Sequence, residues 1–164
     1  NRMPKAPEFK YPEYFQLQPH REYIRNHPDL PPPSAGYVVE DLDMLIRGYG
    51  PRFKTDKTGK FMLIELKFGK KWLTYGQLQT FRLIHNLLRQ ADPDKKRYIG
   101  FFIVNYSDVD WNRADLAINH IPLSKEKFDR FLGLEAVGIP ELDWEKEANM
   151  IREGQRKDGK NDSH

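Results

Sequence analysis

A nearly continuous apolar segment, residues 97–106, most constrains what this chain can fold into. Its sequence is RYIGFFIVNY, and apart from Gly100 every residue from Ile99 to Val104 is large and apolar. A strand with apolar side chains on both sides must be covered on both faces. The chain has 164 residues, 13% of them aromatic, which is enough to build such a core in one domain.

The first 36 residues are rich in proline and end in PDLPPPSAG. This composition predicts an extended arm with one short helix over about 19–27. Two strands are predicted next, over 37–48 (YVVEDLDMLIRG) and 60–69 (KFMLIELKFG). Residues 49–59 contain the glycine, proline and turn-forming residues of a connection.

The longest helix is predicted over 75–91, where Asp92-Pro93 ends it. A further strand is predicted over 111–121 and a short helix over 124–134, capped by Ser124. The charged residues 141–164 predict a disordered tail. This order of elements predicts an α/β (α+β) fold with a mixed central sheet flanked by helices. We therefore expect three segments along the chain, namely an N-terminal arm over 1–36, a folded core over 37–140 and a C-terminal tail over 141–164.

Composition excludes several classes of site. The chain has no cysteine, so disulfides, zinc ribbons, iron–sulfur clusters and cysteine nucleophiles are ruled out. No apolar run reaches the roughly 20 residues of a membrane span, and the first residues lack the apolar stretch of a signal peptide. We therefore expect an intracellular protein, cytoplasmic or nucleoid-associated. The net charge is +3, and residues 61–98 hold eight Lys/Arg against three Asp/Glu, so this basic region could face phosphates.

The strand over 60–69 contains an unusual ion pair. Glu65 and Lys67 are two residues apart and therefore point to the same face, which begins with Phe61 and Leu63. A salt bridge on an edge strand would explain an isolated Glu-x-Lys. The flanking apolar residues instead indicate a covered strand, in which charges must be paired or bind a metal.

Asp43 on the preceding strand is the candidate partner of Glu65, if the two strands form an antiparallel hairpin. A tight turn at Lys57-Thr58 would leave Asp43 seven positions out of step with Glu65. A loop over 49–59 would place Gly48 opposite Lys60 and Asp43 opposite Glu65. Pro51 favours the longer loop because it would interrupt a paired strand, but the sequence does not fix the register.

In the second register, two carboxylates converge with a lysine beside them. Mg²⁺ commonly takes one or two protein carboxylates and leaves its other positions to water and phosphate. Such a metal can hold a phosphate and lower the pKa of a bound water. The lysine could orient that water or neutralise charge on the phosphate.

The helix over 75–91 directs one of its two early glutamines toward the core. If Gln77 is set at zero on a helical wheel, Phe81, Ile84, Leu88 and Ala91 lie within about 40° of it. Gln79 lies near 200° on the same wheel, on the opposite side, given about 100° per residue.

Together these residues resemble the PD-(D/E)XK nuclease superfamily. Asp43, a gap of 21 residues and then IELK provide the pattern, with "LD" where the family has "PD". Residues 77–81, QLQTF, resemble the Q-L-x-x-Y element of the RecB-type exonuclease branch, with Phe81 in place of tyrosine. The resemblance covers about residues 20–105 and implies a restriction-endonuclease-like core with helix–strand–strand–helix–strand order.

The resemblance implies the following roles. Asp43, Glu65 and the backbone carbonyl of Leu66 would bind one or two Mg²⁺, with Mn²⁺ as a substitute. Lys67 would act on the attacking water, and Gln77 would position the lysine, the water or a phosphate. Further metal-ligand candidates are Glu22 and Asp41, although Glu22 is more simply an exposed helix acid.

Residues after the Glu-x-Lys strand are candidate DNA contacts: Lys70 and Lys71 for phosphates, and Trp72 and Tyr75 for stacking on unpaired bases. A solvated turn would explain them equally well. Arg47 is a weaker phosphate candidate. The histidines show no metal-binding spacing, and His85 is expected on the helix flank. No phosphate-binding loop or serine triad is present.

The sequence thus predicts a metal-dependent deoxyribonuclease, compatible with DNA recombination or repair and with a phage or mobile-element origin. A homodimer or higher homo-oligomer is compatible with the resemblance. Two alternatives stay open. One is a nucleic-acid-binding module on the same fold without hydrolysis, and the other is a protein-interaction domain that uses the proline-rich arm.

Overall fold

The computed structural model of the chain describes residues 23–24 and 26–161. The chain divides into two units, with the boundary between Val39 and Glu40. In the first unit, residues 33–35 form the short 3-10 helix η1 (Pro33–Ala35). The helix expected over 19–27 lies largely outside the described residues, and only Tyr23, Ile24 and Asn26 of it are described as helical.

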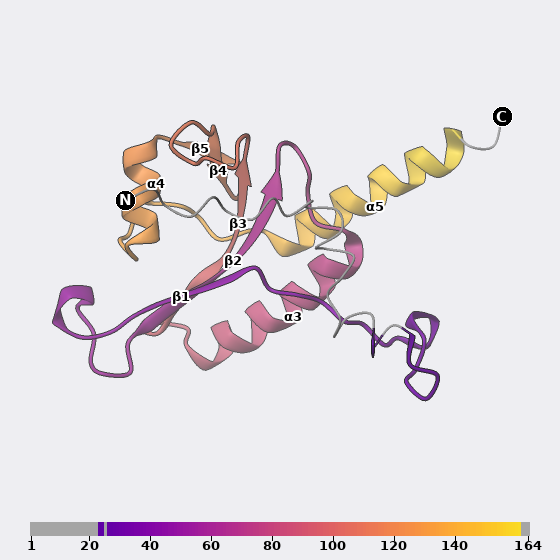
Figure 1. Cartoon of the computed structure of the whole chain (residues 1–164), viewed down its shortest axis with the longest axis horizontal. Helices are drawn as coiled ribbons and strands as arrows, with labels where there is room; N and C mark the ends of the chain where they lie inside the picture. Colours follow the sequence, from indigo (N-terminus) through magenta and orange to yellow (C-terminus); the bar gives the residue numbers. More distant parts are fainter. Residues whose placement is uncertain (1–22, 25, 162–164) are drawn as a thin grey trace, which may run out of the picture. The chain divides into compact units, whose positions relative to one another are not determined.

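The second unit is built on a five-stranded mixed sheet in which the strands follow chain order (Figure 1). The central strands β2 and β3 are parallel, and every other neighbouring pair is antiparallel. The predicted class, an α+β fold with a mixed sheet flanked by helices, is confirmed at this level. The strands are β1 (Met44–Gly48), β2 (Lys60–Phe68), β3 (Tyr98–Tyr106), β4 (Leu116–Ile118) and β5 (Ile121–Leu123).

Three α-helices cover the sheet, and the 3-10 helix η2 (Pro51–Phe53) lies in the β1–β2 connection. The helices are α3 (Tyr75–Ala91), α4 (Lys125–Leu132) and α5 (Trp144–Asn161). The bounds of α3 are those predicted. The predicted Ser124 cap is also confirmed, because its hydroxyl oxygen accepts a hydrogen bond from the Lys127 N–H.

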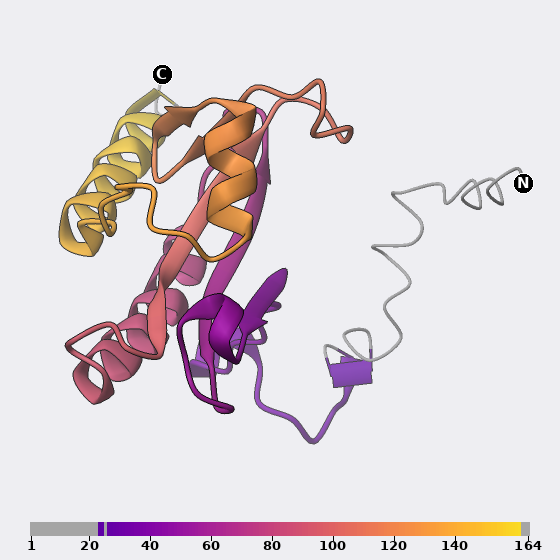
Figure 2. The same ribbon diagram turned by 90° about the vertical axis from the view of Figure 1, so that its left-hand side faces the viewer.

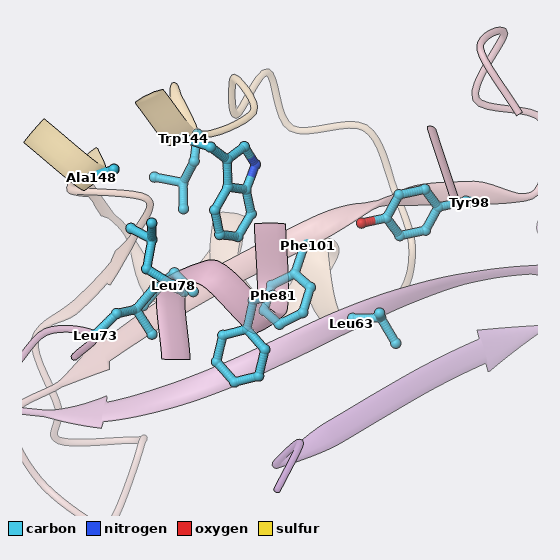
Figure 3. Packing of buried hydrophobic residues seen from close by; sticks show 10 residues of the cluster. Leu63, Leu73, Leu78, Phe81, Tyr98, Phe101, Trp144 and Ala148 are labelled. Atoms are coloured by element: carbon cyan, nitrogen blue, oxygen red, sulfur yellow. The ribbon is translucent and has the colours of Figure 1, made fainter. Parts of the chain in front are cut away.

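The two faces of β2 pack into different hydrophobic clusters. Leu63 lies with Leu78 and Phe81 of α3 and Trp144 of α5 (Figure 3). Met62 and Ile64 face the other way, into a cluster that includes Phe128 of α4. Figure 2 accordingly shows α3 and α5 together on one side of the sheet. The prediction that residues 99–104 form a strand covered on both faces is confirmed, because β3 supplies Phe101 to the first cluster and Phe102 to the second.

The β1–β2 register is the one that follows from a loop over 49–59. Gly48 pairs with Lys60 and Met44 pairs with Ile64, so the next position brings Asp43 opposite Glu65. Gly59 helps to fix this turn. Its φ is +84°, and a Cβ there would lie 2.3 Å from the Gly48 carbonyl oxygen.

Two predicted strands were wrong in their extent. The strand predicted over 37–48 is paired only from Met44. The ladder ends there because the Asp43 carboxylate, rather than a backbone carbonyl, accepts the Leu66 N–H. The strand predicted over 111–121 is two short strands, β4 and β5. A two-residue turn at Asn119-His120 joins them, with φ values of 50° and 69°.

The disordered tail predicted over 141–164 was also wrong for its described part. Helix α5 begins at Trp144. The residue before it, Asp143, accepts a hydrogen bond from the Lys146 N–H with its side-chain carboxylate. Trp144 and Ala148 are buried, and Ile151 packs against the same cluster. This i, i+4, i+7 stripe anchors a segment whose other residues are mostly charged.

The buried face of α3 is rotated from the one predicted. Leu78, Phe81 and His85 are buried, and they lie between about 40° and 100° on a wheel with Gln77 at zero. Ala91 is exposed. His85, expected on the helix flank, is buried and forms a 2.8 Å hydrogen bond with the Tyr98 hydroxyl. The rotation leaves Gln77 at the margin of the buried face rather than at its centre.

Candidate active site

Asp43 and Glu65 meet where β1 begins and β2 approaches its carboxyl end. Asp43 is exposed, and its Oδ2 accepts a 2.8 Å hydrogen bond from the Leu66 N–H. Glu65 lies opposite it across the ladder and is only 5% exposed. The register therefore places one solvent-accessible carboxylate beside one buried carboxylate.

The Glu65 carboxylate lacks full compensation for its burial. Its Oε1 lies 3.6 Å from Lys67 Nζ, but Oε2 is buried and has no hydrogen-bond partner among the described residues. The pKa of Glu65 is raised to about 7, first by burial and then by the negative charge of Asp43, while Lys67 opposes both effects. A buried oxygen without a donor, next to a second carboxylate, is an environment that a cation would stabilise.

Lys67 connects this carboxylate to the first turn of α3. Its Nζ donates a 2.9 Å hydrogen bond to Gln77 Oε1 while it pairs with Glu65. The Lys67 side chain is only 14% exposed, so these two partners hold the ammonium group in place. The structure thus brings together four of the predicted residues: Asp43, Glu65, Lys67 and Gln77.

The start of α3 explains why Gln77 points to the lysine. Thr74 caps the helix and accepts a hydrogen bond from the Gln77 N–H, while Gln77 Oε1 accepts one from the Thr74 N–H. This reciprocal capping box fixes the Gln77 side chain. Sequence reasoning missed Thr74, although the Thr-x-x-Gln spacing at the start of a helix is its signature.

Asn105 is a second residue that sequence reasoning missed. It lies opposite Lys67 on β3, and its Nδ2 donates hydrogen bonds to the carbonyl oxygens of Gly69 and Lys71. Asn105 therefore ties the connection between β2 and α3 to the sheet. Only the parallel pairing of β2 and β3 brings it there, and no local pattern in the sequence marked it.

The predicted DNA contacts lie in different surroundings. Lys70 and Lys71 are exposed on the connection after β2. Trp72 is partly buried and stacks against His120, with ring centroids 3.9 Å apart. The Tyr75 hydroxyl accepts a hydrogen bond from Arg152 of α5, which also lies over the Tyr75 ring.

Arg47 is not brought to the site. It lies near the far end of β1, and its guanidinium donates to the carbonyl oxygens of Lys57 and Thr58. In this position it stabilises the loop over 49–59.

Of the additional metal-ligand candidates, Glu22 lies outside the described residues. Asp41 is exposed, and in residues 23–24 and 26–161 no three His, Asp or Glu side chains gather into a group that could hold a metal ion. Among these residues the site therefore offers two carboxylates, which agrees with the small number of protein ligands that Mg²⁺ commonly takes.

Comparisons of the chain with protein-family models, with curated proteins and with solved structures gave no match. None of the helices in the described part of the chain has the length and apolar character needed to cross a membrane.

Proposed function

We propose that this protein is a Mg²⁺-dependent nuclease that hydrolyses DNA phosphodiester bonds. The observation that carries the proposal is the convergence of Asp43, Glu65, Lys67 and Gln77 at one end of β2. Structural ion pairs are normally satisfied, whereas here Glu65 Oε2 is buried and finds no hydrogen-bond donor in the described part of the chain. Strongly perturbed carboxylates beside a charged partner are typical of functional sites.

The arrangement of the core supports a restriction-endonuclease-like fold of the PD-(D/E)XK type. Two antiparallel strands, β1 and β2, are followed by α3 and then by β3, which pairs parallel to β2. Glu65 and Lys67 lie on the second of these strands, and Gln77 lies on the next helix. This is the strand–strand–helix–strand part of the order that the sequence resemblance implies.

The residues present fit a magnesium ion. Asp43, Glu65 and the backbone carbonyl of Leu66 would hold it, and the unpaired Glu65 oxygen would gain a positive partner. When bound, the ion would polarise the phosphate and make a water molecule more acidic.

Lys67 and Gln77 would act on the attacking water and on the phosphate. Hydrolysis forms a bond between the water oxygen and phosphorus, breaks one ester P–O bond, and transfers a proton to the departing alkoxide oxygen. Lys67 Nζ would orient the water or neutralise the charge that develops on the phosphate. Gln77 holds Nζ at 2.9 Å and would therefore position it.

The experiment is cleavage of labelled linear duplex, single-stranded, circular and branched DNA with Mg²⁺, with Mn²⁺ and with EDTA. We expect metal-dependent cutting that Lys67→Ala lowers by at least about 100-fold, and the circular substrate separates endonuclease from exonuclease action. Lys127→Ala is the matched control, because Lys127 is an exposed lysine of α4.

A folded wild-type protein that cuts none of these substrates in either metal would overturn the nuclease proposal. If that protein still bound DNA in a salt-sensitive manner, the alternative of a non-catalytic nucleic-acid-binding module would replace it. The ion pair of Glu65 and Lys67 would then be structural.

A further inference from the structure

A second charged site lies at the opposite end of β2. A cavity of about 500 Å³ opens between the loop before β2 and the loop before β3. Figure 1 shows both loops at the same end of the sheet, away from the first turn of α3. The basic residues that line the cavity are Lys54, Lys60, Lys95, Lys96 and Arg97.

The two carboxylates in this cavity already have partners. Asp56 accepts hydrogen bonds from two nitrogens of Arg97, each at 2.6 Å, and from the backbone N–H groups of Thr58 and Gly59. Its pKa is held well below the usual range, first by the Arg97 hydrogen bond. Asp56 and Arg97 therefore neutralise each other, and Asp56 pairs with none of the lysines that line the cavity.

Asp92 is similarly committed. It accepts the backbone N–H groups of Lys96, Arg97 and Tyr98, and these hydrogen bonds lower its pKa. Among the lysines, only Lys95 has an acidic neighbour, Glu141 at 3.8 Å. Within the described residues, the ammonium groups of Lys54, Lys60 and Lys96 have no hydrogen bond or ion pair.

Two of these lysines adopt a backbone conformation that is unfavourable for them. Lys54 has a φ of 55° and Lys95 a φ of 57°, in the left-handed region that glycine and asparagine occupy more readily. Each residue closes a turn, because the Lys54 N–H donates a hydrogen bond to the Pro51 carbonyl and the Lys95 N–H donates one to the Asp92 carbonyl. Both residues are exposed, and the two turns bring both lysines to the same cavity.

The lining of the cavity indicates the chemistry of its ligand. The residues that form it are lysine, arginine, threonine and aspartate, without an aromatic or large apolar side chain. Such a surface can recognise negative charge but cannot stack on a base. Several ammonium groups around one cavity suit neighbouring phosphates.

We propose that this cavity binds two adjacent phosphate groups of the DNA backbone, at a distance from the cleavage site. The inference rests on the proposed function only in taking DNA as the source of the phosphates. Lys60 precedes Glu65 by five residues on the same strand, which corresponds to about 17 Å. A duplex advances about 3.4 Å per base pair, so the contact would lie at least about five base pairs from the scissile bond.

The test uses the double variant Lys54→Gly/Lys95→Gly, which removes two charges and relieves the backbone strain at both positions. Its matched control is Lys127→Ala/Lys146→Ala, which removes two exposed lysines from α4 and α5. Binding of a labelled linear duplex is measured by fluorescence anisotropy in EDTA over a range of salt concentrations. Binding of inorganic tripolyphosphate is measured by shifts of the backbone amide signals of residues 54–60, 92 and 94–97.

We expect the glycine variant to be at least as stable as wild type, yet to bind DNA several-fold more weakly. The slope of log affinity against log salt should fall in magnitude by about 2, because each lost phosphate contact removes about 0.9. In cleavage assays KM should rise with kcat unchanged, as expected for a purely binding contact. The control pair should leave both the affinity and the slope closer to wild type.

The outcomes separate this proposal from the proposed function. Loss of binding in the glycine variant supports the cavity even if wild type cuts no DNA. Unchanged DNA affinity combined with tripolyphosphate binding would assign the cavity to a free polyphosphate and overturn the backbone contact. Unchanged affinity for both would show that the lysines are not a phosphate site.

Discussion

Successive side chains of β2 point to opposite faces of the sheet, and the two faces differ in chemical character at the carboxyl end of the strand. The face toward α4 is apolar from Met62 onward, with Met62, Ile64 and Leu66 in or against one cluster. The face toward α3 is apolar at Phe61 and Leu63 and then becomes ionic at Glu65 and Lys67. The face toward α4 buries apolar side chains up to the carboxyl end of the strand. The face toward α3 has charged side chains in place of apolar ones at that end. Such a local loss of stability is what a chemical site requires.

The largest expected effect is on the apolar face. Ile64 is fully buried, and Ile64→Ala should lower the free energy of unfolding by about 2–5 kcal/mol, because it removes apolar contacts and leaves a cavity. Urea denaturation followed by circular dichroism measures this change. DNA cleavage per folded molecule should stay near wild type. A variant of full stability would show that the cluster facing α4 repacks around the change.

The neighbouring position on the other face should respond in the opposite sense. In metal-free protein, Glu65→Gln should raise the free energy of unfolding near pH 8 by about 1–3 kcal/mol, since one pKa unit corresponds to about 1.4 kcal/mol. The pKa of Glu65 rises from 4.5 to about 7 in the folded protein, so folding favours the protonated form. The associated stability is fully present below about pH 4.5 and is lost as the pH rises through about 7.

Denaturation of wild type and Glu65→Gln at several pH values in EDTA measures this difference. The gain should shrink toward about pH 5, where the wild-type carboxyl group is largely protonated in the folded protein. Adding Mg²⁺ should raise the Tm of wild type more than that of the variant, because the variant lacks one anionic ligand. A gain that does not depend on pH would contradict a role for the buried charge.

The smallest expected effect sharpens the comparison between the faces. Thr74→Ala and Ser124→Ala each remove a helix cap, on α3 and α4 respectively, and each should cost about 1 kcal/mol. Only Thr74→Ala loosens the capping box that fixes Gln77, so only this variant should also lower cleavage, by several-fold. Equal cleavage rates for both variants would show that Gln77 needs no cap to hold Lys67.

Local signals in the sequence were sufficient for much of the site. Alternation placed Glu65 and Lys67 on one face, and Pro51 favoured the loop that brings Asp43 opposite Glu65. Phe81, Ile84 and Leu88, which the wheel predicts on the core side, pack in or against the cluster, but the buried face also extends to Leu78 and His85. His85 can be buried because it forms a hydrogen bond with the Tyr98 hydroxyl.

Features that depend on distant pairing could not be predicted in the same way. Asn105 reaches the β2–α3 connection only because β2 and β3 are parallel and in one particular register. Helix α5 was missed because its few apolar residues are separated by charged ones. Charged composition indicates disorder only when no apolar surface elsewhere receives the segment, and here α3 and β3 provide that surface.

The docking of α5 also has a consequence for folding while the chain is being synthesised. Trp144, Ala148 and Ile151 complete the cluster around Phe81 and Phe101, yet they are translated long after these phenylalanines. Until that helix leaves the ribosome, the nascent chain carries an uncovered apolar surface of the kind that chaperones bind and that promotes aggregation. A fragment that stops near residue 140 would keep this surface permanently, although it retains all four residues of the candidate active site.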